Sequence, residues 1–470
     1  MSMVVQHNMQ AANANRMLGI TSGAQAKSTE KLSSGYKINR AADDAAGLTI
    51  SEKMRKQLRG LDKASSNAQD GVSSVQTAEG ALTEVHSMLQ RMNELAVQSA
   101  NGTNSSDDRQ AIQDEVDQLT TEIDRVAETT KFNEIYLLKG DNSNTKNVYM
   151  KGHDAGLKGT LTDGAKSATF TMDALQAGDK YTIAGKEYTI GSATTEVTAL
   201  IDKANTDATA DTANKTVDVN GKTYTITYNA AGNTIADADG TAITLDNLKK
   251  AVTGGSKVTY GNTSLTAMTD ADTDGVDDDD SSIITKDVAE TKIKAELLTA
   301  NNIGTVDQAA TVEDANTANG KTSYTINKGY ATVADTLSFN LHVGADADMT
   351  NKITVDIDTM NSANLGIKGI NVKDASGTEA TYAIDAIADA VAKVSSQRSA
   401  LGAVQNRLEH TIDNLDNISE NTSSAESRIR DTDMAKEMVN YSKNNILAQA
   451  GQSMLAQANQ SNQGVLSLLQ

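Results

Sequence analysis

Apolar side chains recur every seven residues near both ends of this 470-residue chain. One series in the N-terminal third contains Val75, Leu82 and Leu89, and a parallel series starts three residues later at Ala78. Near the other end, Leu401, Leu408 and Leu415 repeat at the same interval. Such a repeat is typical of long helices that pack along a narrow seam. We therefore predict a seam formed by Val75, Leu82, Leu89, Leu401, Leu408 and Leu415.

The lack of Pro permits very long helices, because Pro interrupts helix interiors. Residues 107–130 carry a further helical pattern, and Asn101-Gly102 marks a turn before it. Ser106 or Asp107 is the expected N-cap of that helix. Each helical stripe is too narrow to be stable alone, so we expect the helices to pack side by side and bring the chain ends together.

The middle of the chain has a different composition. Residues 141–380 are rich in Thr, Gly, Asp, Asn and Ala, and every Arg lies outside them. Asn220-Gly221 is flanked by strand-like runs and predicts a hairpin with a type I′ turn. A second hairpin is expected around Ala184–Glu187. Further expected elements are strands at 323–326, 336–343 and 353–357 and a helix at 286–299. The predicted fold class is mainly α at both ends, with an inserted β-rich outer region.

The extreme ends bury few apolar side chains. Residues 1–35 and 431–470 are rich in Asn, Gln, Ala and Ser, with scattered Met, Leu and Ile. We expect these ends to fluctuate in a lone subunit and to fold when neighbouring molecules supply the missing surface. This pattern favours assembly over a ligand pocket.

Known catalytic patterns are missing from the sequence. The His residues are scattered and no HExxH motif occurs, which argues against a metallopeptidase. Gly221-Lys222-Thr223 and Gly320-Lys321-Thr322 resemble the end of a phosphate loop but lack its first Gly, so we interpret both as turns. Cys is absent, which excludes disulfides and thiolate metal sites. We predict no enzyme activity, no cofactor and no metal site.

An acidic run, Asp270–Asp280, resembles part of a calcium loop. Position twelve of the loop is Ser281 instead of the bidentate Glu, so a solvated surface loop is the favoured interpretation. The net charge of −20 makes nucleic acid and anionic membranes poor partners. The first residues lack the basic and apolar regions of a secretory signal, and no apolar run is long enough to span a membrane.

The two ends of the chain closely resemble bacterial flagellin. The N-terminal resemblance rests on Lys31–Asn39, Ala42–Leu48, Asn67–Gly71 and Gln90–Gly102. The C-terminal resemblance rests on Leu401–Leu408, Ala425–Ala435, Gln457–Gln460 and Val465–Leu469. These segments occur in the same order as in the family. One departure is Asn462, where many relatives have Pro.

The resemblance implies a subunit that polymerises into the flagellar filament for motility, and it makes the six seam residues a polymerisation seam. Residues 1–45 and 431–470 would form an inner polymerisation domain, and 46–140 with 381–430 a helical bundle domain. Residues 141–380 would form a variable, surface-exposed insertion. The chain would leave the cell unfolded through the flagellar type III apparatus, without a cleaved signal. Its partners would be other flagellin subunits, an export chaperone and the filament cap.

The resemblance also implies recognition by the innate immune receptor Toll-like receptor 5. The family's recognition surface corresponds to Gln90, Arg91, Glu94, Leu95, Gln98 and Glu115. The same residues also suit bundle and subunit contacts. Asn93 departs from well-recognised members, which often carry Arg at this position.

Three other functions remain open at this point. A hook–filament junction protein shares the helical ends, although the C-terminal signature ending at Leu469 favours the filament subunit. An enzyme carried in the insertion is a different class, against which the low aromatic content of 3% argues weakly. An adhesive or glycan-displaying module is the third, because the insertion is rich in Ser and Thr.

Overall fold

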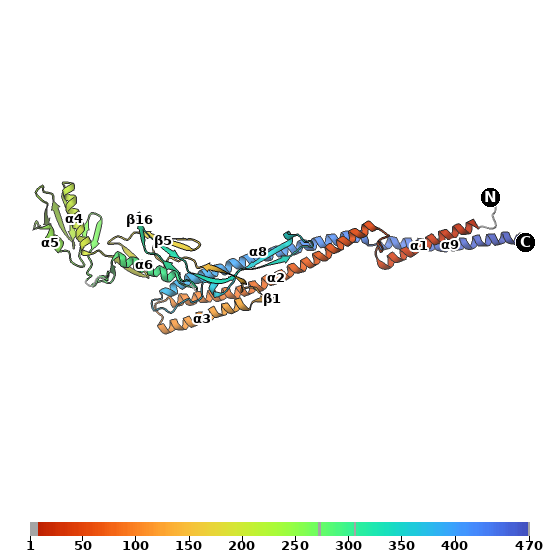
Figure 1. Ribbon diagram of the computed structural model, residues 1–470, viewed down its shortest axis with the longest axis horizontal. Helices are drawn as coiled ribbons and strands as arrows, with labels where there is room; N and C mark the ends of the chain where they lie inside the picture. The colour runs from red at the N-terminus through yellow and green to blue at the C-terminus, as the bar shows by residue number, and fades with distance from the viewer. Residues whose placement is uncertain (1–7, 271–273, 305–306, 469–470) are drawn as a thin grey trace. The chain divides into compact units, whose positions relative to one another are not determined.

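The computed structural model describes residues 8–270, 274–304 and 307–468. Two compact units divide the chain: one comprises Met1–Gln76, Phe339–Val355 and Gly402–Gln470, and the other comprises Thr77–Ser338 and Asp356–Leu401. Helices occupy both ends of the chain and the middle is rich in strands, as Figure 1 shows. This arrangement confirms the predicted fold class.

The first unit is built on two long helices that run antiparallel. These are parts of α2 (Ala45–Ser99) and α8 (Thr378–Arg430). Leu61 and Ala64 of α2 pack with Leu415 of α8, and further along Ala68 packs with Leu408. As the α2 number rises the α8 partner's number falls, which fixes the antiparallel register.

A hairpin covers this helix pair. Strands β19 (Leu337–His342) and β20 (Lys352–Ile357) are joined through a short 3-10 helix, Met349–Asn351. Val343 and Ile353 of the hairpin region share a core cluster with Ala68 and Leu408. A Cβ atom on Gly71 of α2 would lie 2.3 Å from Leu341 Cδ1, so glycine is what allows the close approach here.

The helices of the N-terminal and C-terminal segments of this unit are interrupted at neighbouring positions. Helix α1 (Met9–Ser34) ends at Gly35, which has a φ of 75°, and α9 (Met434–Leu468) starts soon after α8 ends. The Lys37 amide donates to the Arg430 carbonyl at 2.6 Å, and the Thr432 amide donates to the Gly35 carbonyl at 2.9 Å. The Arg430 guanidinium lies 4.8 Å from the centre of the Tyr36 ring. These contacts tie the two breaks together.

The helices of the second unit are the remaining parts of α2 and α8, together with α3 (Ser106–Thr129) and α7 (Ser362–Leu365). Ser105 caps α3 in a capping box with Asp108, so the expected N-cap at Ser106 or Asp107 was wrong by one or two residues. Residues 131–140, which we placed at the end of the helical bundle domain, are not helical. They hold the hairpin β1 (Lys131–Phe132) and β2 (Ile135–Tyr136), whose turn places Asn133 and Glu134 at positive φ.

A larger apolar core lies where two sheets meet α6 (Lys286–Asn301). Its largest fully buried side chains include Phe170 and Tyr324, which face each other across paired strands. One sheet has the order β15-β17-β5-β4 with β16 paired to β17, and the other has the order β14-β7-β6. The strands are β4 (Thr160–Asp163), β5 (Ser167–Asp173), β6 (Lys180–Ile183), β7 (Lys186–Ile190), β14 (Ile283–Ile284), β15 (Thr311–Val312), β16 (Asn316–Ala318) and β17 (Lys321–Asn327).

The expected hairpin around 184–187 is present, but its turn is shorter. Ile183 pairs with Lys186, so only Ala184 and Gly185 form the turn, both at positive φ. The predicted strand at 323–326 lies within β17, and the predicted helix at 286–299 lies within α6.

A six-stranded module with its own core follows β7 in the chain. Its strand order is β11-β10-β9-β8-β12-β13, and α4 (Thr194–Ala210) and α5 (Leu245–Lys250) pack on it. The predicted type I′ turn at Asn220-Gly221 is supported, because both residues have positive φ, 56° and 78°. The strands are β8 (Lys215–Val219), β9 (Lys222–Thr227), β10 (Thr234–Asp237), β11 (Ala242–Ile243), β12 (Lys257–Tyr260) and β13 (Thr263–Thr266).

The chain enters and leaves this module at adjacent points. A β-bridge joins Ser192 to Ala267, the Ser192 amide donates to the Thr266 carbonyl at 3.1 Å, and the Met268 amide donates to the Ser192 carbonyl at 3.0 Å. The module is therefore an excursion from a single place in the second unit.

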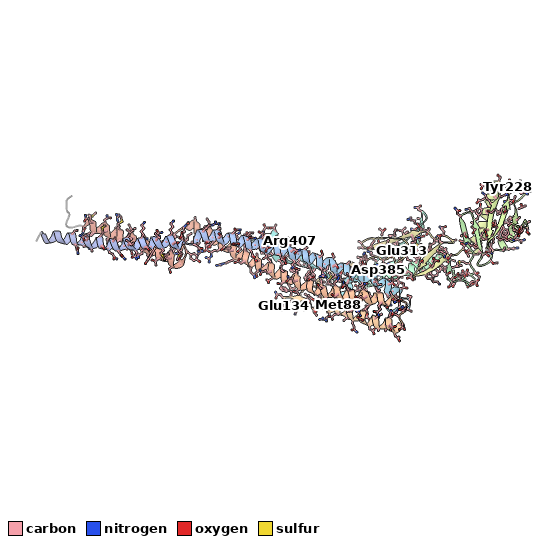
Figure 2. All side chains as sticks on the ribbon, turned by 180° about the vertical axis from the view of Figure 1, so that it is seen from behind. Met88, Glu134, Tyr228, Glu313, Asp385 and Arg407 are labelled. Atoms are coloured by element: carbon pink, nitrogen blue, oxygen red, sulfur yellow. The ribbon has the colours of Figure 1, made fainter. Side chains whose placement is uncertain are left out.

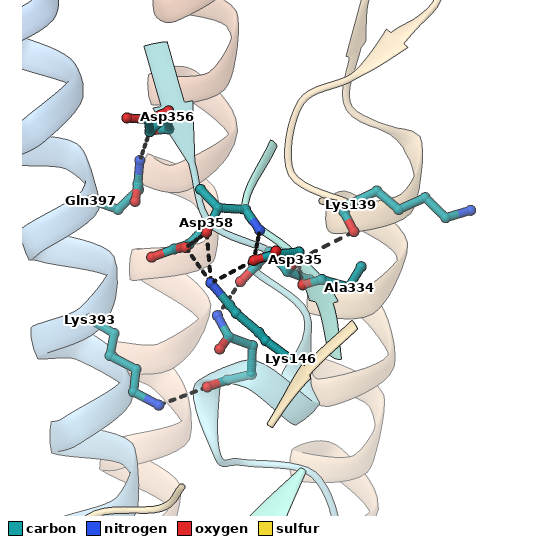
Figure 3. Close-up of polar contacts among 11 residues, drawn as sticks. Lys139, Lys146, Ala334, Asp335, Asp356, Asp358, Lys393 and Gln397 are labelled. Carbon is teal, nitrogen blue, oxygen red and sulfur yellow. Dashed lines mark hydrogen bonds and ion pairs between the residues drawn. The ribbon is translucent and has the colours of Figure 1, made fainter. Parts of the chain in front are cut away.

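Polar contacts join α8 to the strands beside it in the second unit (Figure 3). Strands β3 (Asp141–Tyr149) and β18 (Tyr330–Asp335) pair, and Lys146 Nζ of β3 lies 2.8 Å from Asp358 Oδ1. Burial raises the pKa of Asp358, but hydrogen bonds from Lys146 and Thr336 outweigh burial and hold that pKa below its ordinary value. From α8, Lys393 Nζ donates to the Asn364 carbonyl at 2.7 Å and Gln397 Nε2 to the Asp356 carbonyl at 3.0 Å.

Candidate assembly and recognition surfaces

Helices α1 and α9 pack against each other through a thin contact. Ser28 is the buried residue of α1, and no α9 residue whose side chain is described is buried. Figure 2 draws the side chains that project from this pair. The exposed large apolar residues on the two helices are Met9, Met17, Ile20, Met434, Met438, Val439, Ile446, Leu447 and Met454.

The same pair encloses a shallow apolar groove of about 460 Å³. Met17 and Ala14 line it from α1, and Gly451, Met454 and Ala458 line it from α9. The Asn8 side chain donates to the Ala458 carbonyl at 3.1 Å and closes one end of the contact. The structure gives Met9–Ser34 and Met434–Leu468 as helices, and the expectation that the chain ends fluctuate in a lone subunit stays a prediction. The expectation that they bury little is supported by the exposure of their apolar side chains.

The six seam residues are buried within the single chain. Leu82, Leu89 and Leu408 are fully buried, Val75 and Leu401 are 1% exposed, and Leu415 is 6% exposed. Their immediate use in this structure is to hold one subunit together. Any effect of the seam on assembly would then act through the shape and stability of the subunit.

The residues predicted to meet a receptor lie on α2 and α3 of the second unit. Gln90, Arg91, Glu94 and Gln98 are exposed on α2, and Glu115 of α3 is half-buried. Arg91 bridges the two helices: its Nε lies 2.9 Å from Glu115 Oε1, and one of its terminal nitrogens lies 3.2 Å from Glu94 Oε2. Hydrogen bonds to Glu115 and Glu94 raise the pKa of Arg91. The guanidinium is thus held in place before any partner arrives.

Leu95 differs from the other residues of this surface. Only 2% of it is exposed, so its side chain packs inside the bundle. Asn93, also on α2, is half-buried. Leu95 can therefore affect this surface only by supporting the exposed residues from inside the bundle.

Arg109 of α3 was not anticipated as a structural residue. It is 4% exposed, and its guanidinium donates to the backbone carbonyls of Ser99, Asn101, Asp374 and Ala375 at 2.6–3.3 Å. Gln113, one turn later, accepts from the Val372 amide and donates to the Ile370 carbonyl. Together they hold the loop before α8 against the turn between α2 and α3.

Carboxylates of the acidic run Asp270–Asp280 accept hydrogen bonds from nearby backbone amides. Asp270 accepts from the amides of Asp274 and Gly275, and Asp277 accepts from the amides of Thr269, Asp279 and Asp280. Asp272 lies outside the described residues. Within 8–270, 274–304 and 307–468 no group of three or more His, Asp or Glu side chains is arranged to hold a metal ion.

The His residues do not converge on a catalytic site. His86 contacts Gln90 on α2, and His153 Nε2 lies 3.5 Å from Asp389 Oδ2 of α8. His342 and His410 lie on β19 and α8, and His7 falls outside the described residues. Among the described helices, none combines the length and apolar character needed to cross a membrane. Gly221 and Gly320, the glycines of the two Gly-Lys-Thr sequences, lie in turns between paired strands.

Comparison with known proteins agrees with this arrangement of helical ends. The profile of the bacterial flagellin N-terminal helical region matches residues 5–143, and that of the C-terminal helical region matches residues 384–469. A flagellin of Clostridium tyrobutyricum is 40% identical over 98% of this chain and 100% of its own length. The chain belongs to the bacterial flagellin family. Flagellin B of Vibrio anguillarum is 35% identical over the full length of both chains.

Membership in the flagellin family supports a role as a subunit of the flagellar filament. Flagellins are structural proteins and not enzymes. Among solved structures, FliC of Burkholderia pseudomallei is 18% identical and covers 72% of this chain and 99% of that chain, with a TM-score of 0.29. A score this low carries no weight for the arrangement of the parts of this flagellin.

Proposed function

We propose that this flagellin polymerises into an extracellular filament for motility through the α1–α9 pair. The observation that carries the proposal is the set of large apolar side chains that α1 and α9 leave exposed, among them Ile20, Val439 and Ile446 at 62%, 68% and 67%. Exposed apolar surface on paired helices is typical of an interaction site. Contacts between different faces of successive copies generate a helical filament when the rotation between copies does not close a ring.

In this proposal the parts of the chain have separate tasks. Residues 1–45 and 431–470 form the inner polymerisation domain, and residues 46–140 and 381–430 form the bundle that the seam holds together. Residues 141–380 form the outer insertion. Export through the type III apparatus, an export chaperone and the filament cap belong to the same proposal, because a filament subunit must reach and join the growing end.

Removing residues 436–470 tests the proposal. We expect a monomer that keeps its bundle and β-rich cores but no longer adds to sheared filament seeds. Circular dichroism would check the fold, and light scattering with electron microscopy would follow elongation. Elongation of the truncated chain at the rate of the full chain would reject the role of α9.

A second role, recognition by Toll-like receptor 5, is favoured by the Arg91 bridge. Arg91 presents a planar donor group that Glu94 and Glu115 hold in one position, which lowers the entropy lost on binding. Gln90, Glu94 and Gln98 would supply polar contacts around it, and Leu95 would support them from inside.

Arg91→Ala should weaken receptor binding by about tenfold or more, because an anchoring Arg typically contributes more than about 1.4 kcal/mol. Arg125→Ala is the matched control, since Arg125 is also exposed but pairs with Glu122 on its own helix. Surface plasmon resonance with the receptor ectodomain measures both. Equal affinities for the two variants would remove Arg91 from the recognition surface.

A further inference from the structure

We infer that a stripe of basic residues on α2 is the contact surface for an acidic stripe on α8 of a second copy of this chain. The basic stripe comprises Lys53, Lys56, Arg59 and Lys63, and the acidic stripe comprises Glu409, Asp413, Asp416 and Glu420. Both lie in the first unit. The inference rests on the proposed polymerisation and names one contact within it.

The basic stripe lies on one side of α2 and is open to solvent. Its residues are three, three and four positions apart, which keeps them within an arc of about 120° at 3.6 residues per turn. All four are exposed. None of the four side chains forms an ion pair or a hydrogen bond with any part of the chain that the structure describes.

The carboxylates near the basic stripe bind groups that do not belong to the stripe. Glu52 pairs with Arg430 at 2.9 Å and with Arg55 at 3.3 Å. Asp62 accepts a hydrogen bond from Ser419 of α8 at 3.2 Å. The hairpin loop reaches α2 at Gly60 through Ala345, but the following Asp346 makes no ion pair with the stripe. Four positive charges therefore remain uncompensated in a chain whose net charge is −20.

The acidic stripe is narrower and equally open. Its residues are four, three and four positions apart, which confines them to an arc of about 60°. All four are exposed, and their printed side-chain partners are neutral: Gln405 donates to Glu409, and Ser65 donates to Asp416. No cation pairs with them among the described residues.

The two stripes cannot neutralise each other within one chain. Leu61 and Ala64 against Leu415, and Ala68 against Leu408, fix how α2 and α8 face each other. Helical spacing places the basic stripe on another side of α2, and the acidic stripe reaches α2 at Ser65, which donates to Asp416. A second copy can bring its acidic stripe to the basic stripe of the first, and this head-to-tail contact can repeat indefinitely.

The dimensions and charges of the stripes match. At 1.5 Å per residue the basic stripe is about 15 Å long and the acidic stripe about 16 Å. Each carries four charges of one sign. Because copies of so acidic a chain repel one another overall, a local pair of opposite charge would orient an arriving subunit and speed its addition.

Charge reversal tests the contact in the full-length chain. The basic variant carries Lys56→Glu, Arg59→Glu and Lys63→Glu, and the acidic variant carries Glu409→Lys, Asp413→Lys and Glu420→Lys. Seeded elongation is measured for each alone, for their equimolar mixture and for the chain with all six changes. We expect about a tenfold slower elongation for each variant alone in low salt, and recovery in the mixture and in the combined chain, which regains the original net charge.

The matched control is Lys250→Glu, Lys257→Glu and Lys321→Glu, which adds the same negative charge at exposed positions of the β-rich region. It should elongate within about twofold of the unmodified chain, and salt should narrow the difference between it and the basic variant. Two results would overturn the pairing of the stripes: single variants that elongate like the control, or a mixture and combined chain that fail to recover. Failure of the unmodified chain to elongate would instead reject the proposed function.

Discussion

The six-stranded module and the α1–α9 pair use apolar residues in opposite ways. In the module, Val217, Ile226 and Val258 are less than 1% exposed and α4 covers them. In the α1–α9 pair, Met17, Ile446 and Met454 are more than half exposed. Since burial of apolar surface stabilises a fold, the module is complete in one chain, whereas the helix pair leaves much of its apolar surface uncovered. Under the proposed function, this difference separates residues that stabilise the subunit from residues that join subunits.

The largest effect on folding should come from a complete core. Phe170→Ala removes a fully buried ring that faces Tyr324, and we expect a loss of about 3–5 kcal/mol of local stability. Denaturant unfolding followed by tyrosine fluorescence measures this loss. Elongation from seeds should stay unchanged. A parallel loss of elongation would contradict the division between cores and assembly surfaces, because this core would then also be needed for assembly.

A smaller, pH-dependent effect is expected where α8 meets the strands. The pKa of Asp358 is lowered in the folded chain, so its stabilising contribution is present above the ordinary carboxyl pKa and is lost as the pH falls through the lower folded value. Asp358→Asn should cost about 1 kcal/mol at pH 7, a modest value because the group is partly exposed. The gap between variant and parent should shrink below about pH 3.8 in thermal melts. A gap independent of pH would assign the loss to packing instead.

The smallest effect on folding should come from the helix pair. Ile446→Ser alters a side chain that is 67% exposed, so the monomer's unfolding free energy should change by less than about 0.5 kcal/mol. The lowest concentration that supports elongation should nevertheless rise several-fold. If the variant unfolded at a lower temperature but elongated normally, the apolar side chains of the helix pair would stabilise the subunit and not the contacts between subunits.

The apolar periodicity predicted the long helices, because a helix that buries one face repeats its apolar residues every seven positions. The five leucines and one valine of the seam are all buried, and the Asn220-Gly221 turn has the positive φ values that a type I′ turn requires. By contrast, α4 was missed, although Val197, Leu200, Ile201, Ala204 and Ala208 have helical spacing. Its Thr residues favour strands whereas its Ala residues favour helices, so local propensity alone did not decide the outcome.

The burial of Leu95 and of Arg109 could not be predicted from spacing alone. Leu95 lies outside both heptad series, yet only 2% of it is exposed. Arg109 is buried although Arg is usually exposed, because backbone carbonyls of two separate loops converge on it. The burial of Arg109 depends on contacts between segments far apart in the sequence, which a local pattern does not contain.

The bridge between Ser192 and Ala267 has a consequence for the history of the chain. Because residues 193–266 leave and rejoin the second unit at neighbouring backbone positions, any peptide with similarly spaced ends could stand in their place. Duplication, exchange or deletion at this junction would alter what a filament displays to its surroundings, while the parts that build the filament would keep their geometry.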